Sequence, residues 1–433
     1  MKVVIIGGVA GGATAAARLR RLNEHAEIVV LERSGYVSYA NCGLPYYIGG
    51  VIQNKNALTL QTPQSFKTRF NVDVRVHSEA VAVDRAKKEV RVRETESGRE
   101  YTERYDKLIL SPGARAVVPP VAGADDPRVF TLRTVEDTFR IADYMAAKGA
   151  KRAVVIGGGF VGLEMAENLA ERGVHVSLCE GAGQVMPQMD ADMACFLHAR
   201  LRSAGVDLRL NAKVLGFAEQ DGVFTVRTEK GDLPADFAVL AVGVAPDTAL
   251  AAAAGLATGA RGALLVDEHM RTSDEDSYAV GDAVLVRNAV TGAEGAFALA
   301  GPANRQGRIA ADNVCGIPSV YRGAQGSAVL KLFDMTAAFA GLSERAAKAA
   351  GIACDKVVLF SANHATYYPG AQNMTLKVLF RPENGEILGA QAVGYAGTEK
   401  RIDVLAAAIR AKMTAADLQA LDLCYAPPYS SAK

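Results

Sequence analysis

Short runs of apolar residues alternate with glycine-rich turns and alanine-rich segments along the first part of the chain. Residues 2–6 form a continuous apolar run, residues 7–12 are mostly glycine, and residues 13–22 have the composition of a helix. A second apolar run, residues 28–31, ends at Glu32. Because a buried strand, a tight turn, a helix and another buried strand make up a βαβ unit, this pattern predicts a parallel sheet covered by helices.

The same pattern returns further along the chain. An apolar strand at 153–156 leads into a glycine-rich turn at 157–162, and a helix follows that ends near Glu171. The next apolar run, 174–178, is followed by Glu180. Two such units in one chain predict two nucleotide-binding folds, which hold two nucleotides in separate domains.

The turns carry the binding chemistry of these folds. Glycines permit a tight turn on which the pyrophosphate of a dinucleotide meets the helix N-terminus, and the acid after the second strand accepts the ribose hydroxyls. The candidate residues are Gly7, Gly8, Val9, Ala10, Gly11, Gly12 and Glu32 in the first fold and Gly157, Gly159, Gly162 and Glu180 in the second. The second turn has an intact GxGxxG, whereas Val9 occupies the middle glycine position of the first. Since a carboxylate repels a 2′-phosphate, Glu180 favours NADH over NADPH.

Three further segments extend the two folds. Apolar strands end in turns at Gly113 and Gly243, which we interpret as the exits from the two nucleotide-binding domains. Asp282 follows another short strand and is either a binding residue or an ordinary helix cap. A helix is predicted over 299–314.

The pattern changes to strand-like alternation from about residue 328. Strands are expected at 328–333, 375–380 and 389–393, and a helix at 402–411. This composition predicts an α+β third domain. Its apolar faces suit a dimer interface, although an ordinary core has the same pattern.

The length, charge balance and cysteine spacing of the chain limit the classes of function that it can have. The 433 residues suggest about three domains. The 48 basic and 47 acidic residues nearly cancel, so neither nucleic acid nor an anionic membrane is expected as a partner. No apolar run has the length of a membrane span or a signal peptide, which favours a cytoplasmic protein. The six cysteines lack a CxxC pair or metal-ligand spacing, so we expect reduced thiols and no metal site.

Cys42 is the candidate for chemistry. It stands in the stretch 38–47, shortly after the strand that ends at Glu32. The thiolate is the redox-active form of cysteine, and a position at the opening of a helix lowers a thiol pKa through the helix dipole. A lone cysteine is usually a small buried apolar residue. The two nucleotide folds beside it favour a redox-active Cys42 with a lowered pKa.

Together, the two nucleotide folds, the glycine turns, the Gly281-Asp282 pair and the C-terminal domain resemble the FAD-dependent pyridine nucleotide-disulfide oxidoreductases over essentially the whole chain. The resemblance implies an α/β protein with two Rossmann-like domains, one for FAD and one for NAD(P)H, and a C-terminal α+β dimerisation domain. The implied boundaries are 1–115 and 245–325 for the FAD domain, 116–244 for the NAD(P)H domain and 326–433 for the interface domain.

The number of redox cysteines separates branches of this family. The glutathione and lipoamide enzymes use CxxxxC, but the fifth residue after Cys42 is Tyr47. The chain therefore resembles the single-cysteine branch, which contains coenzyme A-disulfide reductases and NADH oxidases or peroxidases that cycle a cysteine sulfenic acid. The peroxide enzymes carry a histidine where this chain has Ala10. The strings Asn-Cys-Gly-Leu-Pro-Tyr-Tyr, 300–307 and 425–430 are closer to the coenzyme A-disulfide reductases, and the NADH oxidase or peroxidase activity is the alternative.

The resemblance also implies a site. Cys42 would cycle as a mixed disulfide with coenzyme A, and Tyr367 and Tyr425 would reach it from the partner subunit of a homodimer. The implied coenzyme A ligands are Thr14, Arg18, Arg21, Ser38, Asn41 and Asn304. Arg18 and Arg21 lie three residues apart on one helix face, where they suit an anionic ligand, although a solvated basic face looks the same.

Several questions stay open at the level of sequence. They are the physiological disulfide or persulfide, the preference between NADH and NADPH, the extent of oxygen reduction, and whether Tyr367 or Tyr368 faces the site. Relatives of this kind often continue past the Ser-Ser-Ala-Lys ending into a rhodanese domain, so a shortened or partial form is one reading of this chain. Flavoproteins that serve a protein partner without a redox cysteine are a further alternative, and Cys42 argues against them.

Overall fold

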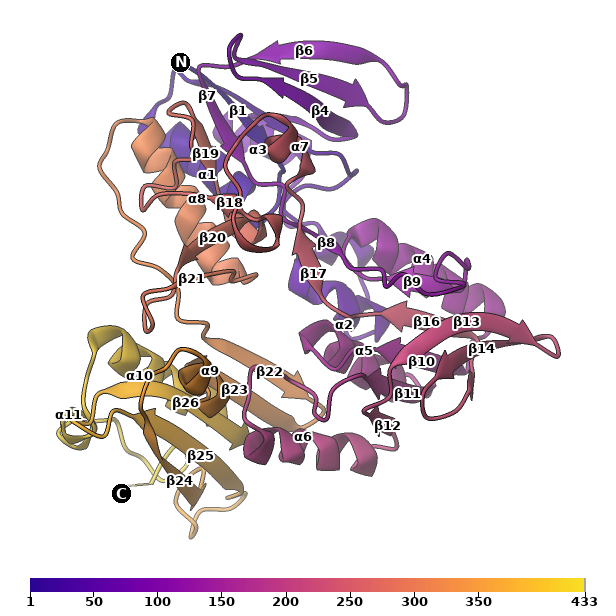
Figure 1. The fold of residues 1–433 in the computed structure, drawn as a ribbon, viewed down its shortest axis with the longest axis vertical. Coiled ribbons are helices and arrows are strands. Elements are labelled where there is room, and N and C mark those ends of the chain that lie inside the picture. Colours follow the sequence, from indigo (N-terminus) through magenta and orange to yellow (C-terminus); the bar gives the residue numbers. More distant parts are fainter. Residues whose placement is uncertain (432–433) are drawn as a thin grey trace.

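The computed structural model describes residues 1–431 and contains three five-stranded sheets with helices packed against them, besides smaller sheets (Figure 1). The last two residues of the expected interface domain, 432 and 433, lie outside the described residues. The predicted fold class is confirmed, with two parallel nucleotide-binding sheets and an antiparallel C-terminal sheet.

The first sheet brings together strands from distant parts of the chain. Its order is β19-β7-β1-β2-β3, all parallel. The strands are β1 (Lys2–Ile6), β2 (Glu27–Leu31), β3 (Asp73–Arg75), β7 (Lys107–Leu110) and β19 (Ser277–Ala279). Val3, Val4 and Ile5 are fully buried, as expected for a central strand of a parallel sheet that is covered on both faces. The sheet therefore includes β19, a strand from the region after Gly243.

Two helices cross closely over this sheet. They are α1 (Ala10–Leu22) and α8 (Ala300–Val314). A Cβ added to Gly307 would lie 2.4 Å from the carbonyl oxygen of Gly11. Glycine at this crossing thus permits the helix backbones to approach each other, which brings polar side chains of α1 and α8 together.

The second sheet repeats the first. Its order is β12-β11-β10-β16-β9, and all of its pairs are parallel. The elements are β9 (Val129–Thr131), α4 (Val135–Lys148), β10 (Arg152–Ile156), α5 (Phe160–Glu171), β11 (His175–Glu180), α6 (Ala191–Ser203), β12 (Asp207–Leu210) and β16 (Phe237–Leu240). The two chain segments that connect the sheets pair with each other, as β8 (Ala114–Ala116) and β17 (Val244–Pro246). The exits predicted at Gly113 and Gly243 thus lie beside this ribbon.

The third sheet is antiparallel, with the order β22-β23-β26-β25-β24. The elements are β22 (Ala328–Leu332), β23 (Met335–Gly341), α9 (Glu344–Ala349), β24 (Asp355–Ala362), β25 (Asn373–Phe380), β26 (Ile387–Gly394), α10 (Thr398–Ala411) and α11 (Ala415–Gln419). Every residue of β26 is buried, whereas the edge strand β24 exposes Val357, Leu359 and Phe360. An exposed apolar edge of this kind is typical of an interface.

The remaining elements are short. They are η1 (Asn41–Gly43), α2 (Leu44–Ile48), η2 (Lys55–Leu58), α3 (Pro63–Phe70), β4 (Ser78–Asp84), β5 (Glu89–Glu94), β6 (Glu100–Arg104), β13 (Val214–Gln220), β14 (Val223–Thr228), β15 (Leu233–Pro234), α7 (Ala249–Ala253), η3 (Ala260–Gly262), β18 (Leu264–Leu265), η4 (Gly281–Ala283), β20 (Val284–Arg287) and β21 (Glu294–Gly295). The sequence analysis did not anticipate the small sheets β4-β5-β6 and β13-β14-β15.

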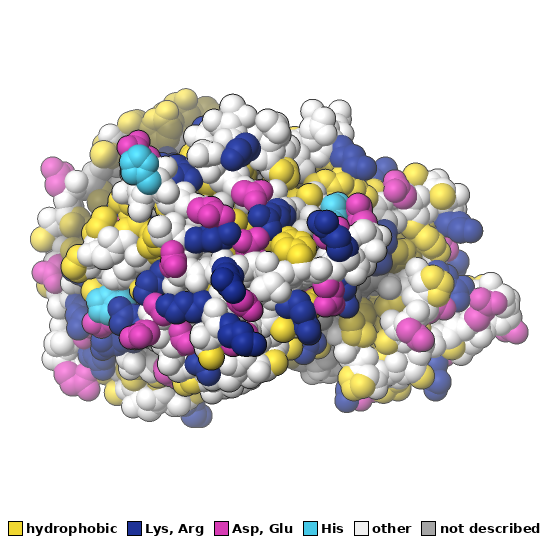
Figure 2. All heavy atoms as spheres, turned by 90° about the horizontal axis from the view of Figure 1, so that it is seen from above, with side chains coloured by type: hydrophobic (Ala, Val, Ile, Leu, Met, Phe, Trp, Pro, Cys, Tyr) yellow, Lys and Arg dark blue, Asp and Glu magenta, His cyan; other side chains and the backbone are white. Residues whose placement is uncertain are grey.

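A continuous hydrophobic core joins the second sheet to α2 and to the third sheet. It includes Leu44 and Ile48 of α2, Leu163 of α5 and Leu332 of β22. The segment that follows Cys42 is therefore held by packing against two other parts of the fold. In Figure 2, basic and acidic side chains are interspersed over the face shown, in agreement with the near-zero net charge. Within residues 1–431, none of the helices combines the length and apolarity needed to cross a bilayer.

Candidate functional site

A large cleft lies where the three sheets meet. Its volume is about 1820 Å³. The walls include both glycine turns, Cys42, the Gly281-Asp282 pair, the residues that lead into β22 and the residues that follow β23. A cleft of this size, lined by a thiol and by two glycine turns, has room for extended ligands.

The first turn needs glycine at its two ends. Gly7 has a φ of 96°, and a Cβ there would lie 2.0 Å from the carbonyl oxygen of Ser111. A Cβ on Gly12 would lie 1.9 Å from the carbonyl oxygen of Gly7. Val9, in contrast, has a φ of −100° as the N-cap of α1. A side chain is therefore tolerated at the middle position without backbone strain.

The second turn has the same construction. Gly157 has a φ of 107°, and a Cβ on Gly162 would lie 1.8 Å from the carbonyl oxygen of Gly157. Gly159 has no atom within 4 Å of its ideal Cβ position and lines the cleft. This open position is where a pyrophosphate can approach the backbone at the N-terminus of α5.

The two acids brace these turns from the ends of β2 and β11. Glu32 accepts a hydrogen bond from the Gly8 amide at 2.9 Å, and Glu180 accepts one from the Gly158 amide at 2.6 Å. The other oxygen of each carboxylate accepts from the amide two residues later, at 3.0 and 2.7 Å. Each carboxylate thus lies at the strand end where a ribose would meet it, and both turns fit a dinucleotide.

Cys42 lies in η1, a single turn that precedes the five-residue helix α2. The residue is exposed. Although the residue reaches solvent, the protein atoms packed around its sulfur partly exclude water and raise the pKa of Cys42. The charges of Glu164 and Asp282 raise it further, and Arg133 opposes them. The expected lowering of this pKa is therefore wrong for the single chain, because α2 is too short for a large dipole and two acids lie nearby.

Glu164 is a residue of the cleft that the sequence analysis missed. It lies on α5, two residues after Gly162, and lines the cleft together with Cys42. Burial raises its pKa to about 7, and the charge of Glu167 adds to the rise. The hydroxyl of Tyr46 donates to Glu164 at 3.5 Å. A carboxyl group with a pKa near neutrality thus lies close enough to Cys42 for its charge to act on that thiol.

Asp282 lies in η4 and receives a hydrogen bond from Arg133 at 3.2 Å. Burial raises the pKa of Asp282, and the charge of Arg133 opposes this. Asp282 does not cap α8, because Leu299 is the N-cap of that helix. Arg133 also donates to the carbonyl oxygen of Ala114, so it joins the cleft to the connection between the sheets. The sequence gives no signal for Arg133, since its partners lie far away along the chain.

The candidate coenzyme A residues of α1 and α8 are partly brought together. The Thr14 hydroxyl donates to Asn304 at 2.7 Å, across the helix crossing. Arg18 forms an ion pair with Asp312, also at 2.7 Å. Arg21 is exposed, with its guanidinium 5.9 Å from the ring centroid of Phe70. Of the two arginines, Arg18 is thus paired with an acid of the same chain, and binding of phosphate by Arg21 stays a prediction.

Ser38 and Asn41 flank the approach to Cys42. Ser38 adopts a φ of 47°, and its amide donates to the Gly8 carbonyl oxygen at 2.8 Å. This bond fixes the chain before Cys42 against the first glycine turn. Asn41 is exposed and lines the cleft.

The two candidate tyrosines pair with each other in the third domain. The hydroxyl groups of Tyr367 and Tyr425 are 2.9 Å apart, and these residues are 74% and 48% exposed. Neither lines the cleft that contains Cys42 of the same chain. Tyr368 packs edge-on against His364. The single chain therefore brings the tyrosines to one another and not to Cys42.

Comparisons with known proteins agree with these observations. Residues 1–307 match the family described as pyridine nucleotide-disulphide oxidoreductase, and residues 327–433 match its dimerisation domain. The chain is 33% identical to a coenzyme A disulfide reductase of Staphylococcus haemolyticus, over 100% of this chain and 97% of that protein. It is also 33% identical to an NADH oxidase of Methanocaldococcus jannaschii, over 99% and 96% of the two chains.

Two solved structures superpose closely on the chain. One is reduced Bacillus anthracis CoADR-RHD, with a TM-score of 0.97 and 47% identity over 100% of this chain and 78% of that one. The other is a NAD-dependent persulfide reductase from A. fulgidus, with a TM-score of 0.97 and 40% identity over 100% and 81%.

Proposed function

This chain belongs to the pyridine nucleotide-disulphide oxidoreductases, and we propose that it reduces coenzyme A disulfide or persulfide with NADH through Cys42. The family is one of flavin-dependent oxidoreductases that use a pyridine nucleotide. The observation that carries the proposal is the place of Cys42, an exposed thiol in one cleft with both glycine turns. Relatives named for coenzyme A disulfide and for persulfide support the substrate class.

The proposed reaction begins at the sulfur of Cys42. Its thiolate attacks one sulfur of coenzyme A disulfide, the S–S bond breaks, and one coenzyme A leaves as a thiolate that takes up a proton. Two electrons from NADH then cleave the mixed disulfide, which releases the second coenzyme A and restores the Cys42 thiolate. Bound FAD supplies the two-electron chemistry that links the nicotinamide to the sulfur. The net change is oxidation of one NADH and formation of two thiols.

The residues of the chain have separate roles in this proposal. The turns that end at Gly12 and Gly162 bind FAD and NADH respectively, and Glu32 and Glu180 accept their ribose hydroxyls. The Thr14–Asn304 pair and Arg21 bind coenzyme A. The Tyr367–Tyr425 pair of a partner subunit donates a proton to the leaving thiolate. The dimerisation domain and the exposed tyrosine pair support this composite site.

The second candidate function is an NADH oxidase or peroxidase that cycles Cys42 through a sulfenic acid. The relative of that name supports it. The same thiol and the same nucleotide turns would serve both reactions. Ala10 provides no acid-base group at the first turn, so the coenzyme A reaction is preferred.

Intact-protein mass spectrometry tests the proposal directly. The purified protein is expected to carry one coenzyme A per chain that dithiothreitol removes, and Cys42→Ser is expected to keep FAD while it loses disulfide reductase activity. Flavin binding should survive because it depends on the first turn. Full activity in Cys42→Ser would refute the mechanism. Peroxide turnover that exceeds coenzyme A disulfide turnover would favour the second candidate.

A mixing experiment tests the partner's tyrosines. Cys42→Ser and Tyr425→Phe subunits are each expected to have low activity as homodimers. A heterodimer of the two has one intact composite site, so activity should return after subunit exchange. No recovery despite demonstrated exchange would show that Tyr425 acts within its own chain or not at all.

A further inference from the structure

The segment Val185–Asp190 connects the second nucleotide turn to the third domain. It precedes α6 and contributes Pro187 and Gln188 to the wall of the cleft. Met186 is fully buried and has a φ of 48°, a left-handed conformation that is uncommon for a residue other than glycine. Its amide donates to the carbonyl oxygen of Gly158 at 2.8 Å. One end of the segment is thus bonded to the turn that fits the nicotinamide nucleotide.

The other end of the segment is bonded to the third sheet. The amide of Asp190 donates to the side chain of Gln391 at 2.8 Å, and Gln391 donates back to the Asp190 carboxylate at 2.6 Å. Gln391 lies on β26 and is 1% exposed. Such a two-way buried contact leaves Asp190 a single arrangement relative to the sheet.

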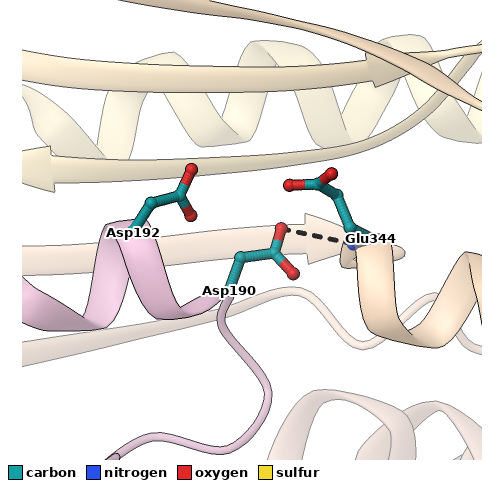
Figure 3. A group of neighbouring side chains, drawn as sticks. All are labelled: Asp190, Asp192 and Glu344. Carbon is teal, nitrogen blue, oxygen red and sulfur yellow. Dashed lines mark hydrogen bonds between the residues drawn. The ribbon is translucent and has the colours of Figure 1, made fainter.

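Lys377 completes this attachment. Its side chain, from β25, is fully buried. The ammonium lies 3.0 Å from Asp190 and 2.8 Å from Asp192, and it also pairs with Glu344. Figure 3 shows the three carboxylates converging from the segment, α6 and α9. Three such acids resemble a metal site, but here they share an ammonium group.

Lys377 remains protonated at neutral pH. Burial alone would lower the pKa of Lys377, but the hydrogen bonds with Asp192, Glu344 and Asp190 outweigh it and raise that pKa. A protonated Lys377 is thus the common partner of acids that would otherwise repel one another. A further contact holds the middle of the segment, since the guanidinium of Arg345 donates to the carbonyl oxygen of Pro187.

We propose that Lys377 is a positioning residue for the nicotinamide nucleotide. It acts by fixing the segment Val185–Asp190 between the third domain and the Gly158 turn. A left-handed residue such as Met186 persists only where its surroundings over-determine it. The buried contacts of Asp190 supply that constraint at one end, and the Gly158 carbonyl supplies it at the other. The inference rests on the proposed use of NADH.

The first test is the Lys377→Met variant, which keeps an unbranched side chain one heavy atom shorter and removes the charge. The measurement is anaerobic flavin reduction by increasing NADH in the FAD-bound enzyme, which needs no disulfide substrate. We expect the Kd for NADH to rise about 10-fold, while the limiting rate changes less than about 3-fold, because misplacement of a wall of the site weakens binding first. The matched control is Lys356→Met, which removes an exposed ion pair with the same Glu344. It should behave as wild type.

Hydrogen exchange provides a readout independent of activity. In Lys377→Met, peptides that cover Met186 to Asp190 should exchange faster, while peptides of the first sheet keep the wild-type rate. A uniform rise in exchange with loss of FAD would indicate a merely structural role and overturn the proposal. An unchanged Kd for NADH would also overturn it.

Arg345→Met keeps the proposal testable if Lys377→Met fails to fold. Arg345 is exposed, so its loss leaves no buried charge. We expect an increase of about 3-fold in the Kd for NADH, from loss of one contact to the segment; no increase would overturn the proposal. Failure of the proposed function can be distinguished from failure of this positioning role. In that case coenzyme A disulfide is not reduced by wild type, whereas the effect on nucleotide binding can still be measured with whichever nucleotide reduces the flavin.

Discussion

The raised pKa of Glu164 predicts a specific dependence of stability on pH. Burial first and the charge of Glu167 second raise this pKa from 4.5 to about 7. Between these two values the folded state binds more protons than the unfolded state, so stability falls as pH rises through this window. A shift of this size corresponds to about 3 kcal/mol, an upper value because water partly screens the carboxylate. Glu164→Gln removes the titrating group and leaves a side chain of the same shape.

The expected result is that the melting temperatures of the Glu164→Gln variant and wild type agree at low pH and separate as the pH rises. At pH 5 the Glu164→Gln variant and wild type should melt at similar temperatures, since Glu164 is protonated in the folded protein. At pH 8 the variant should be more stable by up to about 3 kcal/mol. With an unfolding entropy of about 0.9 kcal/mol/K for a chain of this length, the difference is about 3 °C. It is larger if the second nucleotide domain unfolds by itself, because a smaller unit has a smaller entropy.

The assay is thermal release of flavin, followed by its fluorescence at several pH values. The comparison of two variants at each pH cancels the titration of all other groups. Glu171→Gln is the matched control, because Glu171 lies on the same helix and is exposed. An equal difference in melting temperature between the variant and wild type at pH 5 and at pH 8 would refute this prediction. In that case the buried Glu164 would not destabilise the fold when it ionises.

Three further predictions concern the ligands. Gly12→Ala places a methyl group 1.9 Å from a carbonyl oxygen, so the purified variant should retain less than about one tenth of the wild-type FAD; full flavin content would contradict this. Glu180→Ala should raise the ratio of kcat/KM for NADPH to that for NADH by about 10-fold or more, and an unchanged ratio would reject the role of that acid. Arg21→Met should raise the KM for coenzyme A disulfide more than Arg18→Met does, because Asp312 already neutralises Arg18. Equal effects at low salt would contradict this order.

The two nucleotide folds could be predicted because their signals are local. The first and last glycines of each turn must lack a Cβ, since a carbonyl oxygen lies within about 2.5 Å of that position. The apolar runs that precede the turns form β1 and β10 as expected. Val9 departs from the glycine pattern at a position whose φ is negative. The backbone of the turn therefore requires glycine at the first and last positions of the motif but accepts a side chain at the middle position.

The electrostatics of the site could not be predicted because they depend on distant residues. Glu164, Asp282 and Arg133 all act on Cys42, yet they come from three separate parts of the chain. The pairing of Arg18 with Asp312 is likewise set by the crossing of α1 and α8. The small antiparallel sheets were missed for a different reason. A strand such as β5 alternates apolar with charged residues and has no continuous apolar run, and its register is set by pairing with β4.

Two incomplete halves of a site argue for its assembly from two subunits. Within one chain, burial and then the charges of Glu164 and Asp282 raise the pKa of Cys42, and the charge of Arg133 only partly offsets them, so the thiolate is poorly stabilised there. The Tyr367–Tyr425 pair is exposed, and the hydrogen bond with Tyr425 raises the pKa of Tyr367. A pair of neutral phenols can donate a hydrogen bond to a thiolate, whereas ionised phenols would repel it. Protonated tyrosines can therefore serve as the hydrogen-bond donor that the Cys42 thiolate lacks within its own chain. The dimerisation domain carries these tyrosines, so dimer formation provides a way to bring them to Cys42 of the partner subunit.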